Sequence, residues 1–491
     1  MMETVINIST AAGSAVMANL FYINLVLSIV IVFFQRKDPK SVWAWLLVMY
    51  FVPIVGFILY MLIGQDMHKR RMFRTKEIAD ELNSAIRKQE ERIFKNEFKS
   101  GSNDINEFSD LILYNLESAD AVYTDDNEIE IYTDGETKFD ALIEEIQKAK
   151  QYIHVQYYII RSDEVFTRIM EALIEKVKEG VEVRILYDSM GCRYLKKSDV
   201  KKLRENGVMT AEFFPAFLRR LHLRINYRNH RKIVVIDGKT AFVGGFNVGK
   251  EYIGKSKKFG NWRDTHLKIT GSAVISLGVR FILDWNYAAK ENLFHTDKYF
   301  EEKKLETTGS NGIQIISSGP DSMNQNIRNN YVRLINKSQN NIYIQSPYFI
   351  PDDVVLDALK IAAMSGIDVR VMIPCKPDHP FVYWATYSYM SDLLSVGAKC
   401  YTYDDGFLHA KGMVIDRKVA CYGTANMDIR SFKLNFEVNA VIYNQDTAAK
   451  LENIFMEDLN HSTQITPYIY ANRPFIIRFK EQISRLLSPL L

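Results

Sequence analysis

The order of hydrophobic and polar positions divides the chain into an apolar start, a polar segment and a long region of short alternating elements. Two runs without a charged side chain, 11–34 and 42–63, each exceed the roughly 20 residues that a helix needs to cross a bilayer core. We therefore predict a two-helix transmembrane hairpin over residues 1–66. In the alternative, one of the two runs is a re-entrant or interfacial helix, and the first run, with its Asn19, Asn24 and Ser28, fits this better.

Basic residues beside these runs predict the orientation of the hairpin in a cell membrane. The loop between the runs carries three of them, and the segment 69–76 carries five. Because Lys and Arg favour the cytoplasmic side, we expect the bulk of the chain to lie in the cytoplasm. The segment 67–108 is highly charged and rich in helix formers, which is typical of a solvated helical connector.

From residue 109 onward the pattern alternates between amphipathic helices and short β-branched strands, and it does so twice. The segment 146–159 resembles 335–350, and each leads into an acidic helix start, a helix, a Gly turn and a strand. This repeat of roughly 180 to 190 residues is far too long for a solenoid. It predicts an α/β fold made of two pseudo-symmetric halves, 109–305 and 306–491.

Each half contains the same polar motif, His-x-Lys-x4-Asp followed at the same distance by Gly-x-x-Asn. Its members are His230, Lys232, Asp237 and Asn247 in the first half and His409, Lys411, Asp416 and Asn426 in the second. With nine histidines in the chain, about 0.04 chance matches to the three-residue pattern are expected. Two matches in one register indicate a functional site. If the halves face each other across a pseudo-twofold axis, the motifs meet in one active site.

These residue types suit displacement at a phosphodiester, which without a metal needs a nucleophile, a proton donor and fixed positive charge. One neutral imidazole, of His230 or His409, can form a phosphohistidine while the other, protonated, donates to the leaving oxygen. The polar side chains predicted to hold nonbridging phosphate oxygens are Lys232, Lys411, Asn247 and Asn426.

Four acidic residues accompany the histidines. Asp237 and Asp416 end strands, where they either take part in catalysis or tie the loops together. Each imidazole also needs a partner that fixes its tautomer, and Asp264 and Glu437, downstream of the motifs, are the candidates.

The composition of the chain argues against some classes of cofactor and partner. The four cysteines are widely separated and form no C-x-x-C pair, and no clustered pattern of His and carboxylates indicates a metal site. We expect no cofactor. A net charge of +3 gives no general case for binding nucleic acid. The oligomeric state is left open.

The duplicated motif resembles that of the phospholipase D superfamily, and nearly the whole chain is similar, more narrowly, to the bacterial cardiolipin synthases. The segments that carry the narrower resemblance are Trp43-Ala-Trp45-Leu, Pro53-Ile-Val-Gly56, Gln345-Ser-Pro-Tyr-Phe-Ile-Pro351, Asn426-Met-Asp428-Ile-Arg430-Ser431 and Arg485-Leu-Leu-Ser-Pro-Leu-Leu491. The resemblance implies halves built on a mixed sheet flanked by helices, and condensation of two phosphatidylglycerol molecules to cardiolipin and glycerol without a metal.

The resemblance also implies roles for the site residues. His230 becomes the nucleophile that carries a phosphatidyl group, and His409 becomes the general acid and base, with Asp264 and Glu437 as orienting carboxylates. The two halves can exchange these roles. The anionic substrate, phosphatidylglycerol, and the lipid bilayer are the implied partners.

Several rival functions use the same residues. A phospholipase D that transfers to water, or a phosphatidyltransferase with another donor or acceptor, needs the same motifs. A nuclease of the superfamily does too, but the apolar start and the low net charge argue against it. A noncatalytic membrane scaffold would have no need for both copies of His, Lys and Asn.

Two further segments have the composition of lipid-contacting surfaces. A basic insertion, 219–224, follows Phe213, Phe214 and Phe217, and it either presses on anionic headgroups or forms a solvated loop above a hydrophobic anchor. The amphipathic segment that begins at Phe475 either lies on the membrane or closes the domain.

Overall fold

The computed structural model describes residues 19, 22, 24–26, 28–29, 39–52, 56, 60, 107–215, 227–299, 309–322, 324–486 and 488. The chain forms two compact units, one made of Met1–Met67 with Ala216–Tyr227 and the other of His68–Pro215 with Arg228–Leu491.

In the smaller unit, the helix α2 covers Pro39–Phe51. Its Trp45 packs edge to face on Tyr60 with ring centroids 5.3 Å apart, and the Asn24 amide donates to the Met49 carbonyl at 3.1 Å. None of the helices in the described residues is both long and apolar enough to span a bilayer. Most of the predicted hairpin and nearly all of the connector lie outside these residues, and both stay predictions.

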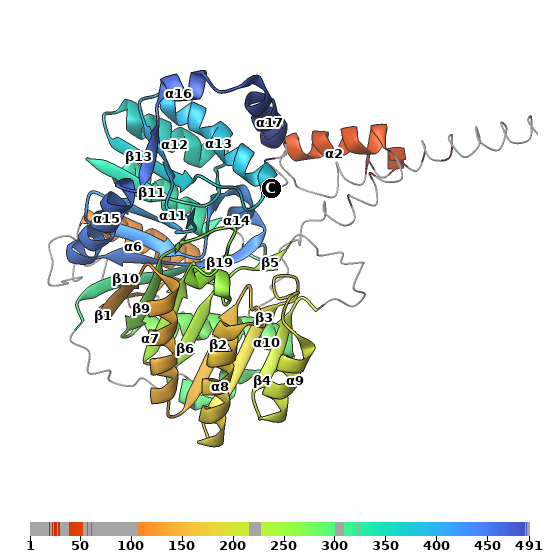
Figure 1. Ribbon diagram of the computed structural model, residues 1–491, viewed down its shortest axis with the longest axis vertical. Coiled ribbons are helices and arrows are strands. Elements are labelled where there is room, and N and C mark those ends of the chain that lie inside the picture. The colour runs from red at the N-terminus through yellow and green to blue at the C-terminus, as the bar shows by residue number, and fades with distance from the viewer. Residues whose placement is uncertain are drawn as a thin grey trace, which may run out of the picture. The chain divides into compact units, whose positions relative to one another are not determined.

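The larger unit is built on one 16-stranded sheet (Figure 1). The first half contributes β1 (Tyr123–Tyr132), β2 (Tyr152–Tyr157), β3 (Glu182–Asp188), β4 (Met209–Phe213), β6 (Ile233–Ile236), β7 (Thr240–Gly244) and β9 (His266–Thr270). The second half contributes β10 (Asn311–Ser318), β11 (Asn341–Gln345), β13 (Asp368–Pro374), β14 (Lys399–Tyr403), β16 (Gly412–Ile415), β17 (Val419–Gly423), β19 (Asn435–Tyr443) and β20 (Ser462–Ile465). The sixteenth strand, β5 (Arg228–Asn229), pairs with β19. Four further two-residue strands form two separate pairs, β8 (Trp262–Arg263) with β15 (Phe407–Leu408) and β12 (Phe349–Ile350) with β18 (Met427–Asp428).

The strand order repeats between the halves. It runs β1-β9-β7-β6-β2-β3-β4 in the first and β10-β19-β17-β16-β11-β13-β14 in the second, and β1 pairs with β10 where the halves join. Within each half two consecutive pairs, β2 with β3 and β3 with β4, or β11 with β13 and β13 with β14, are parallel, and the others on the path are antiparallel. The duplicated α/β architecture with a mixed sheet is thereby confirmed.

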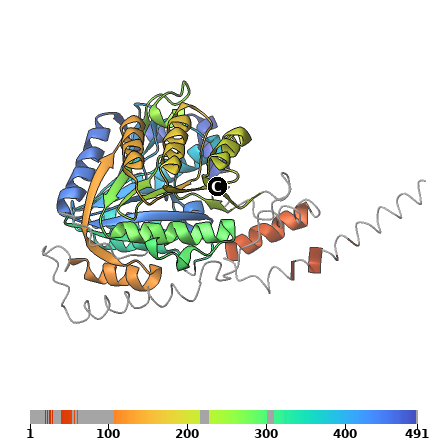
Figure 2. The ribbon, with the colours of Figure 1, turned by 90° about the horizontal axis from the view of Figure 1, so that it is seen from below.

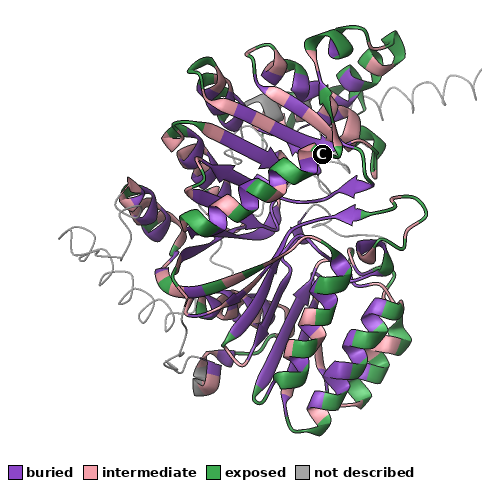
Figure 3. Ribbon diagram, turned by 60° about the vertical axis from the view of Figure 1, so that its left-hand side comes forward, coloured by how far each residue is buried: buried purple, intermediate pink, exposed green. Residues whose placement is uncertain are grey.

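Helices cover both faces of the sheet, and the strands between them are buried along most of their length (Figures 2 and 3). The described α-helices of the larger unit are α6 (Ser109–Ala119), α7 (Gly135–Lys148), α8 (Glu164–Lys178), α9 (Lys197–Glu205), α10 (Ala273–Ala289), α11 (Asn326–Lys337), α12 (Asp353–Met364), α13 (Pro380–Leu394), α14 (Ile429–Lys433), α15 (Gln445–Leu459), α16 (Pro467–Ala471) and α17 (Phe475–Leu486), of which α16 and α17 pack on α13. Burial on both faces explains why central strands such as β6 and β16 are near-continuous apolar runs.

The predicted helix boundaries reflect local chemistry. The carboxylates of Asp163 and Asp352 accept the backbone N–H groups at the starts of α8 and α12, as N-caps do. Gly180 and Gly366 follow the ends of these helices with φ of +89° and +93°, a conformation that favours glycine.

The hydrophobic anchor before the basic insertion lies inside the protein. Phe213 and Phe214 are buried and their rings pack on Phe436 at 5.3 and 5.9 Å. The positions of Phe213 and Phe214 therefore fit the interpretation of a hydrophobic anchor. They do not fit contact of these two side chains with lipid headgroups. Phe217 and the basic residues 219–224 lie outside the described residues.

Packing does not follow chain order at the start of the larger unit. Leu111 and Ile112 of α6 belong to the same hydrophobic core as Ile327 and Leu334 of α11 in the second half. The predicted first half, which begins at residue 109, therefore starts with a helix that packs in the core of the second half. The boundary itself stays a prediction.

Candidate active site

Two short strand pairings bring each motif histidine to the opposite half. β5 pairs in parallel with the start of β19, and the His230 amide donates to the Phe436 carbonyl at 2.9 Å. β15 pairs in parallel with β8, and the His409 amide donates to the Arg263 carbonyl at 2.7 Å. Each histidine is therefore fixed by backbone bonds to the half that does not contain it.

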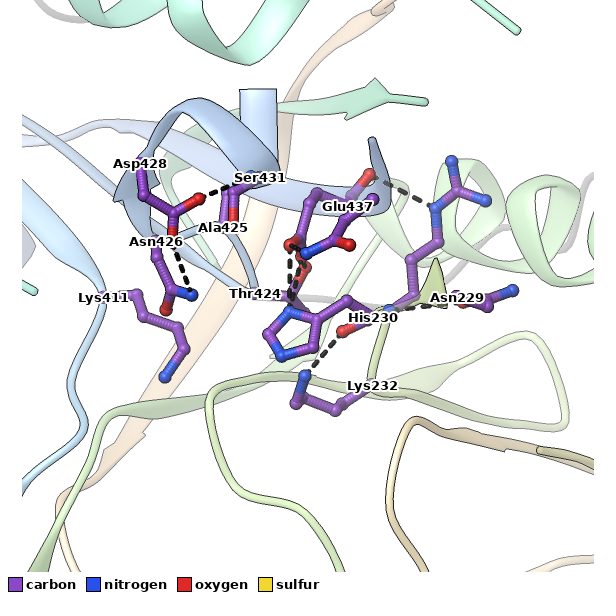
Figure 4. Close-up of polar contacts among 12 residues, drawn as sticks. Asn229, His230, Lys232, Lys411, Thr424, Ala425, Asn426, Asp428, Ser431 and Glu437 are labelled. Carbon is purple, nitrogen blue, oxygen red and sulfur yellow. Dashed lines mark hydrogen bonds and ion pairs between the residues drawn. The ribbon is translucent and has the colours of Figure 1, made fainter. Parts of the chain in front are cut away.

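The imidazoles are held by carboxylates that are exchanged between the halves. Figure 4 shows the first of these contacts, between His230 and Glu437. His230 Nδ1 lies 2.9 Å from Glu437 Oε1, and His409 Nδ1 lies 2.5 Å from Asp264 Oδ2. Both carboxyl groups are fully buried. Because Nδ1 is engaged in each ring, Nε2 is the nitrogen available for reaction. The two predicted orienting residues thus meet the two histidines.

The motif lysines have matching positions. Lys232 Nζ donates to the His230 carbonyl and Lys411 Nζ to the His409 carbonyl, each at 2.5 Å. Lys411 Nζ also lies 2.8 Å from His409 Nδ1. Burial lowers the pKa of Lys232 to about 7 and that of Lys411 to about 8, although nearby Glu437 and Asp264 oppose the shift. The site therefore holds two ammonium groups that are costly to keep charged without an anion.

The lysines of both motifs act on each histidine. Burial lowers the pKa of His230 to about 4; Glu437 opposes this shift, and the positive charges of Lys232 and Lys411 add to it. Burial likewise lowers the pKa of His409 to about 4, helped by Lys411 and Lys232. Each imidazole thus senses the lysines of both halves, and Figure 4 shows Lys411 on the same side of His230 as Lys232. The predicted meeting of the motifs is present in the structure.

The two asparagines lie buried beside the motifs. Asn247 Oδ1 accepts the Ile159 amide at 3.0 Å, which orients its side chain. Asn426 Nδ2 donates to Asp428 Oδ2 at 3.2 Å, while within the described residues its Oδ1 has no hydrogen-bond partner. Their binding of phosphate oxygens stays a prediction.

Asp237 and Asp416 are not brought to the histidines. Asp237 accepts the amides of Lys150, Gln151 and Tyr152 at 2.7 to 2.9 Å, at the far end of β6 from His230. Asp416 repeats this arrangement in the second half, accepting the amides of residues 339–341. Of the two roles expected for these carboxylates, the contacts support the tying of loops.

We expect Asp237→Asn to lower the free energy of unfolding by about 2 kcal/mol, because the amide cannot accept all three backbone N–H groups. Thermal unfolding measures this change. Asp357→Asn, on the exposed side of α12, is a matched control and should change stability by less than about 0.5 kcal/mol. Equal stabilities of the two variants, or loss of turnover without loss of stability in Asp237→Asn, would contradict the structural role.

Two supporting residues were not found from the sequence. Thr424 Oγ1 donates to Glu437 Oε2 at 2.6 Å. At the corresponding position of the first half stands Gly245, where an added Cβ would lie 1.8 Å from Asp264 Oδ1. The aligned Gly-x-x-Asn segments were visible, but only the structure identifies the second residue of each segment as the one that faces the carboxylate.

A second pair of buried ion pairs lies behind the histidines. Arg231 Nη1 contacts both Asp284 oxygens at 2.6 and 2.7 Å, and Gln156 donates to Asp284 at 2.6 Å. Arg263, Asp458 and Gln345 form the corresponding group, with Arg263 supplied by the first half. Both groups could have been anticipated from the sequence, because a Gln recurs at the same position of the repeated segments 146–159 and 335–350.

Among the described residues, no cluster of three or more His, Cys, Asp or Glu side chains is arranged to hold a metal ion. The sequence-based expectation that no metal is needed stays a prediction, and a chelator tests it.

Family models match most of this architecture. A model described as "Cardiolipin synthase, PLD-like domain" matches residues 142–259 and 331–459, one stretch around each motif. A model described as "Phospholipase_D-nuclease N-terminal" matches residues 23–65.

Curated relatives are similar over almost the whole chain. "Cardiolipin synthase" of Oceanobacillus iheyensis is 49% identical over 96% of this chain and 98% of its own length. "Major cardiolipin synthase ClsA" of Bacillus subtilis is 48% identical over 97% and 99%. "Cardiolipin synthase 2" of Staphylococcus epidermidis is 50% identical over 96% of both chains.

A solved structure supports the fold. The crystal structure of phosphatidylserine synthase from Haemophilus influenzae superposes with a TM-score of 0.60 over 78% of this chain and 99% of that chain, at 16% identity. At this identity the likeness concerns the fold alone. Taken with the curated relatives and the paired motifs, it leads to one conclusion: the chain belongs to the cardiolipin synthases of the phospholipase D superfamily.

Proposed function

We propose that the protein joins two phosphatidylglycerol molecules to give cardiolipin and glycerol, through a phosphatidyl group carried on His230. The observation that supports this most directly is the pair of imidazoles whose Nδ1 atoms are held by the carboxylates of the opposite halves. Such a pair presents two Nε2 atoms to one phosphate, which is the requirement for a nucleophile and a proton donor in a single displacement.

In the first step His230 Nε2 attacks phosphorus, and the bond from phosphorus to the glycerol oxygen breaks. His409 donates its proton to that oxygen, and glycerol leaves. Both rings have a low pKa in the empty site. The bound phosphodiester adds a negative charge, which raises the pKa of the histidine beside the leaving oxygen. Asp264 stabilises the proton on His409 from the other side of the ring.

In the second step a headgroup hydroxyl of another phosphatidylglycerol attacks phosphorus. His409, now neutral, accepts its proton, the bond between phosphorus and His230 breaks, and cardiolipin forms. The charge on the nonbridging oxygens is greatest during each displacement, when Lys232, Lys411, Asn247 and Asn426 are proposed to hold them. Glu437 stabilises the charge that develops on His230.

The experiment that tests this function resolves products. Purified protein in mixed micelles receives phosphatidylglycerol labelled in its headgroup, with a metal chelator present, and cardiolipin, phosphatidic acid and free glycerol are measured. Equal amounts of cardiolipin and glycerol support the transferase. Phosphatidic acid in place of cardiolipin would identify a hydrolase, and arrest by the chelator would contradict the metal-free mechanism.

We expect the kcat/KM for phosphatidylglycerol to fall as the pH rises through 7 and 8. The pH dependence of kcat/KM reports the ionisable groups of the free enzyme. Lys232 and Lys411, with pKa values of about 7 and 8, lose their charges in this range. Below its pKa each lysine is an ammonium that attracts the lipid phosphate; above it the attraction disappears. Initial rates between pH 6 and 9 check this, with adsorption to micelles measured at each pH as the control. Because the low pKa of the free His409, about 4, already lowers kcat/KM steadily with pH, a decline of constant slope through 7 and 8 would show that the lysines keep their charges.

The remaining proposals concern organisation. We assign residues 1–66 to a transmembrane hairpin, 67–108 to a connector, and 109–305 and 306–491 to the two catalytic halves. The active site then lies at the cytoplasmic face of the cell membrane. Cysteine labelling from either side of sealed vesicles, at positions in 35–41 and in 69–76, tests this orientation.

A further inference from the structure

The helix α17 carries its apolar side chains outward. Phe475, Phe479 and Leu486 are 80%, 53% and 77% exposed, whereas Glu481 and Ser484 on the opposite side are 0% and 1% exposed. A helix that only closes a domain in water shows the reverse arrangement, with its apolar face on the core. The orientation of α17 therefore requires a separate explanation.

An ion pair fixes this orientation. The Glu481 carboxylate accepts two hydrogen bonds from Arg473, each of 2.6 Å, and lies 3.3 Å from the Tyr470 hydroxyl. α17 packs on α13, as Figure 1 shows. This pair joins a fully buried carboxylate to a partly buried guanidinium, so turning Glu481 outward would break it. The outward position of the phenylalanines is thus built into the fold.

The exposed apolar side chains form one stripe with basic flanks. We call the residues Phe475, Ile476, Phe479, Ile483 and Leu486 the α17 face. At 100° per residue they occupy a sector of about 100° on the helix. Arg478 and Lys480 lie on either side of the sector, and Lys480 Nζ is 5.4 Å from the ring centre of Trp384 on α13. Aromatic and aliphatic side chains flanked by Lys and Arg are the composition of interfacial helices.

We propose that the α17 face lies in the surface of an anionic bilayer, as a lipid contact separate from the N-terminal hairpin. Two features favour a bilayer, and not another protein, as the partner of the α17 face. The cations at the flanks complement the charge of anionic headgroups, and an enzyme of this family finds its lipid substrates in a bilayer. The proposal goes beyond the catalytic function, because it concerns how the catalytic halves are held against the membrane.

The position of α13 connects this surface to the active site. α13 bears α17 on its side, and Asp378 lies two residues before its first residue, Pro380. The negative charge of Asp378 opposes the lowering of the Lys411 pKa that burial causes. One helix therefore reaches from the α17 face to the surroundings of the second motif. A bilayer against that face would deliver headgroups to this side of the site.

A probe on α17 tests the proposal in the full chain. Cys375→Ser removes the half-buried native cysteine, and the other three are buried. In that background Phe479→Cys is labelled with an environment-sensitive fluorophore, and Ile361→Cys on α12, 60% exposed in the wild type, is the matched control. Both proteins are reconstituted in vesicles of phosphatidylglycerol and phosphatidylcholine, with and without brominated acyl chains.

The proposal expects quenching by brominated lipid at position 479 and none at 361. A blue-shifted but unquenched probe at 479 would mean that protein, such as the N-terminal segment of the chain, covers the face. An unshifted and unquenched probe would mean that the face is in water. Either of these outcomes, or equal quenching at both positions, would overturn the proposal, and none of them depends on turnover.

A second measurement uses activity. The triple variant Phe475→Ser, Phe479→Ser, Ile483→Ser should lower transfer on vesicles by about tenfold, because the apolar contact is lost. Transfer with a short-chain phosphatidylglycerol below its micellar concentration should remain unchanged. Ile361→Ser with Met364→Ser, equally exposed on α12, is the control and should alter neither rate. Equal losses on both substrates would show a folding defect, and no loss on vesicles would contradict the proposal.

Discussion

Replacement of His230 by Ala lowers phosphatidyl transfer by at least about four orders of magnitude, and His409→Ala does the same. The expectation follows from one site that both motifs supply, since each ring senses Lys232 and Lys411 together. The double variant should be no slower than either single variant, because the groups act as a unit. Rates of cardiolipin formation with labelled lipid measure all three.

Additive losses in the double variant would contradict a shared site. Thermal unfolding is the control, because both rings are buried and their loss can lower stability. Mixing the two single variants should restore no activity if each chain builds its own site. Recovery in the mixture would instead show that histidines are exchanged between chains.

The same variants separate the roles of the two histidines. A phosphatidyl ester of p-nitrophenol has a leaving group that needs no proton. His409→Ala should therefore still release one equivalent of nitrophenol and keep the phosphatidyl group on His230, whereas His230→Ala should release none. The opposite result would give the nucleophile to His409.

Gly245→Ala is expected to lower the rate of transfer about a hundredfold or more. An added Cβ would lie 1.8 Å from Asp264 Oδ1 and 2.5 Å from its carboxyl carbon, so the carboxylate must move. His409 would then lose the partner that orients Nδ1, without any change to a group that touches the lipid. Misplacement of a catalytic group by about 1 Å costs about this factor. Steady-state rates on micelles measure the loss.

The matched control for this substitution is Gly278→Ala. Gly278 lies within α10, and a Cβ there would meet only Val235 at 3.9 Å. Alanine in a helix interior should raise stability by about 1 kcal/mol and leave transfer unchanged. If Gly245→Ala kept its activity, or lost it only through unfolding, the orienting role of Asp264 would be wrong.

The sequence predicted the motifs and their meeting because both depend on local pattern. The strand over Ile233–Ile236, for example, has the bounds that the apolar run after Lys232 predicts. Asp264 and Glu437 were also identified, but the exchange between halves was not. It rests on pairings made by the two-residue strands β5, β8 and β15, which are too short to show a period.

Other features depend on tertiary packing that no single segment encodes. Phe213 and Phe214 have the composition of a lipid contact, and only their burial against Phe436 shows otherwise. The amphipathic pattern of α17 was evident, whereas the direction of its apolar side was not, because the pairing of Glu481 with Arg473 decides it. A sequence gives the periodicity of such a helix, and the neighbours it packs on give its rotation.

The exchange of carboxylates also has a consequence for biosynthesis. His230 is translated about two hundred residues before Glu437, its partner at Nδ1, and ribosomes add roughly 5–20 residues each second. For tens of seconds a nascent first half carries its histidine without the group that orients it. The imidazole is therefore held inactive until the second half has been made and has folded. A chain truncated before residue 437 would lack the carboxylate that orients His230 and could not complete a transfer.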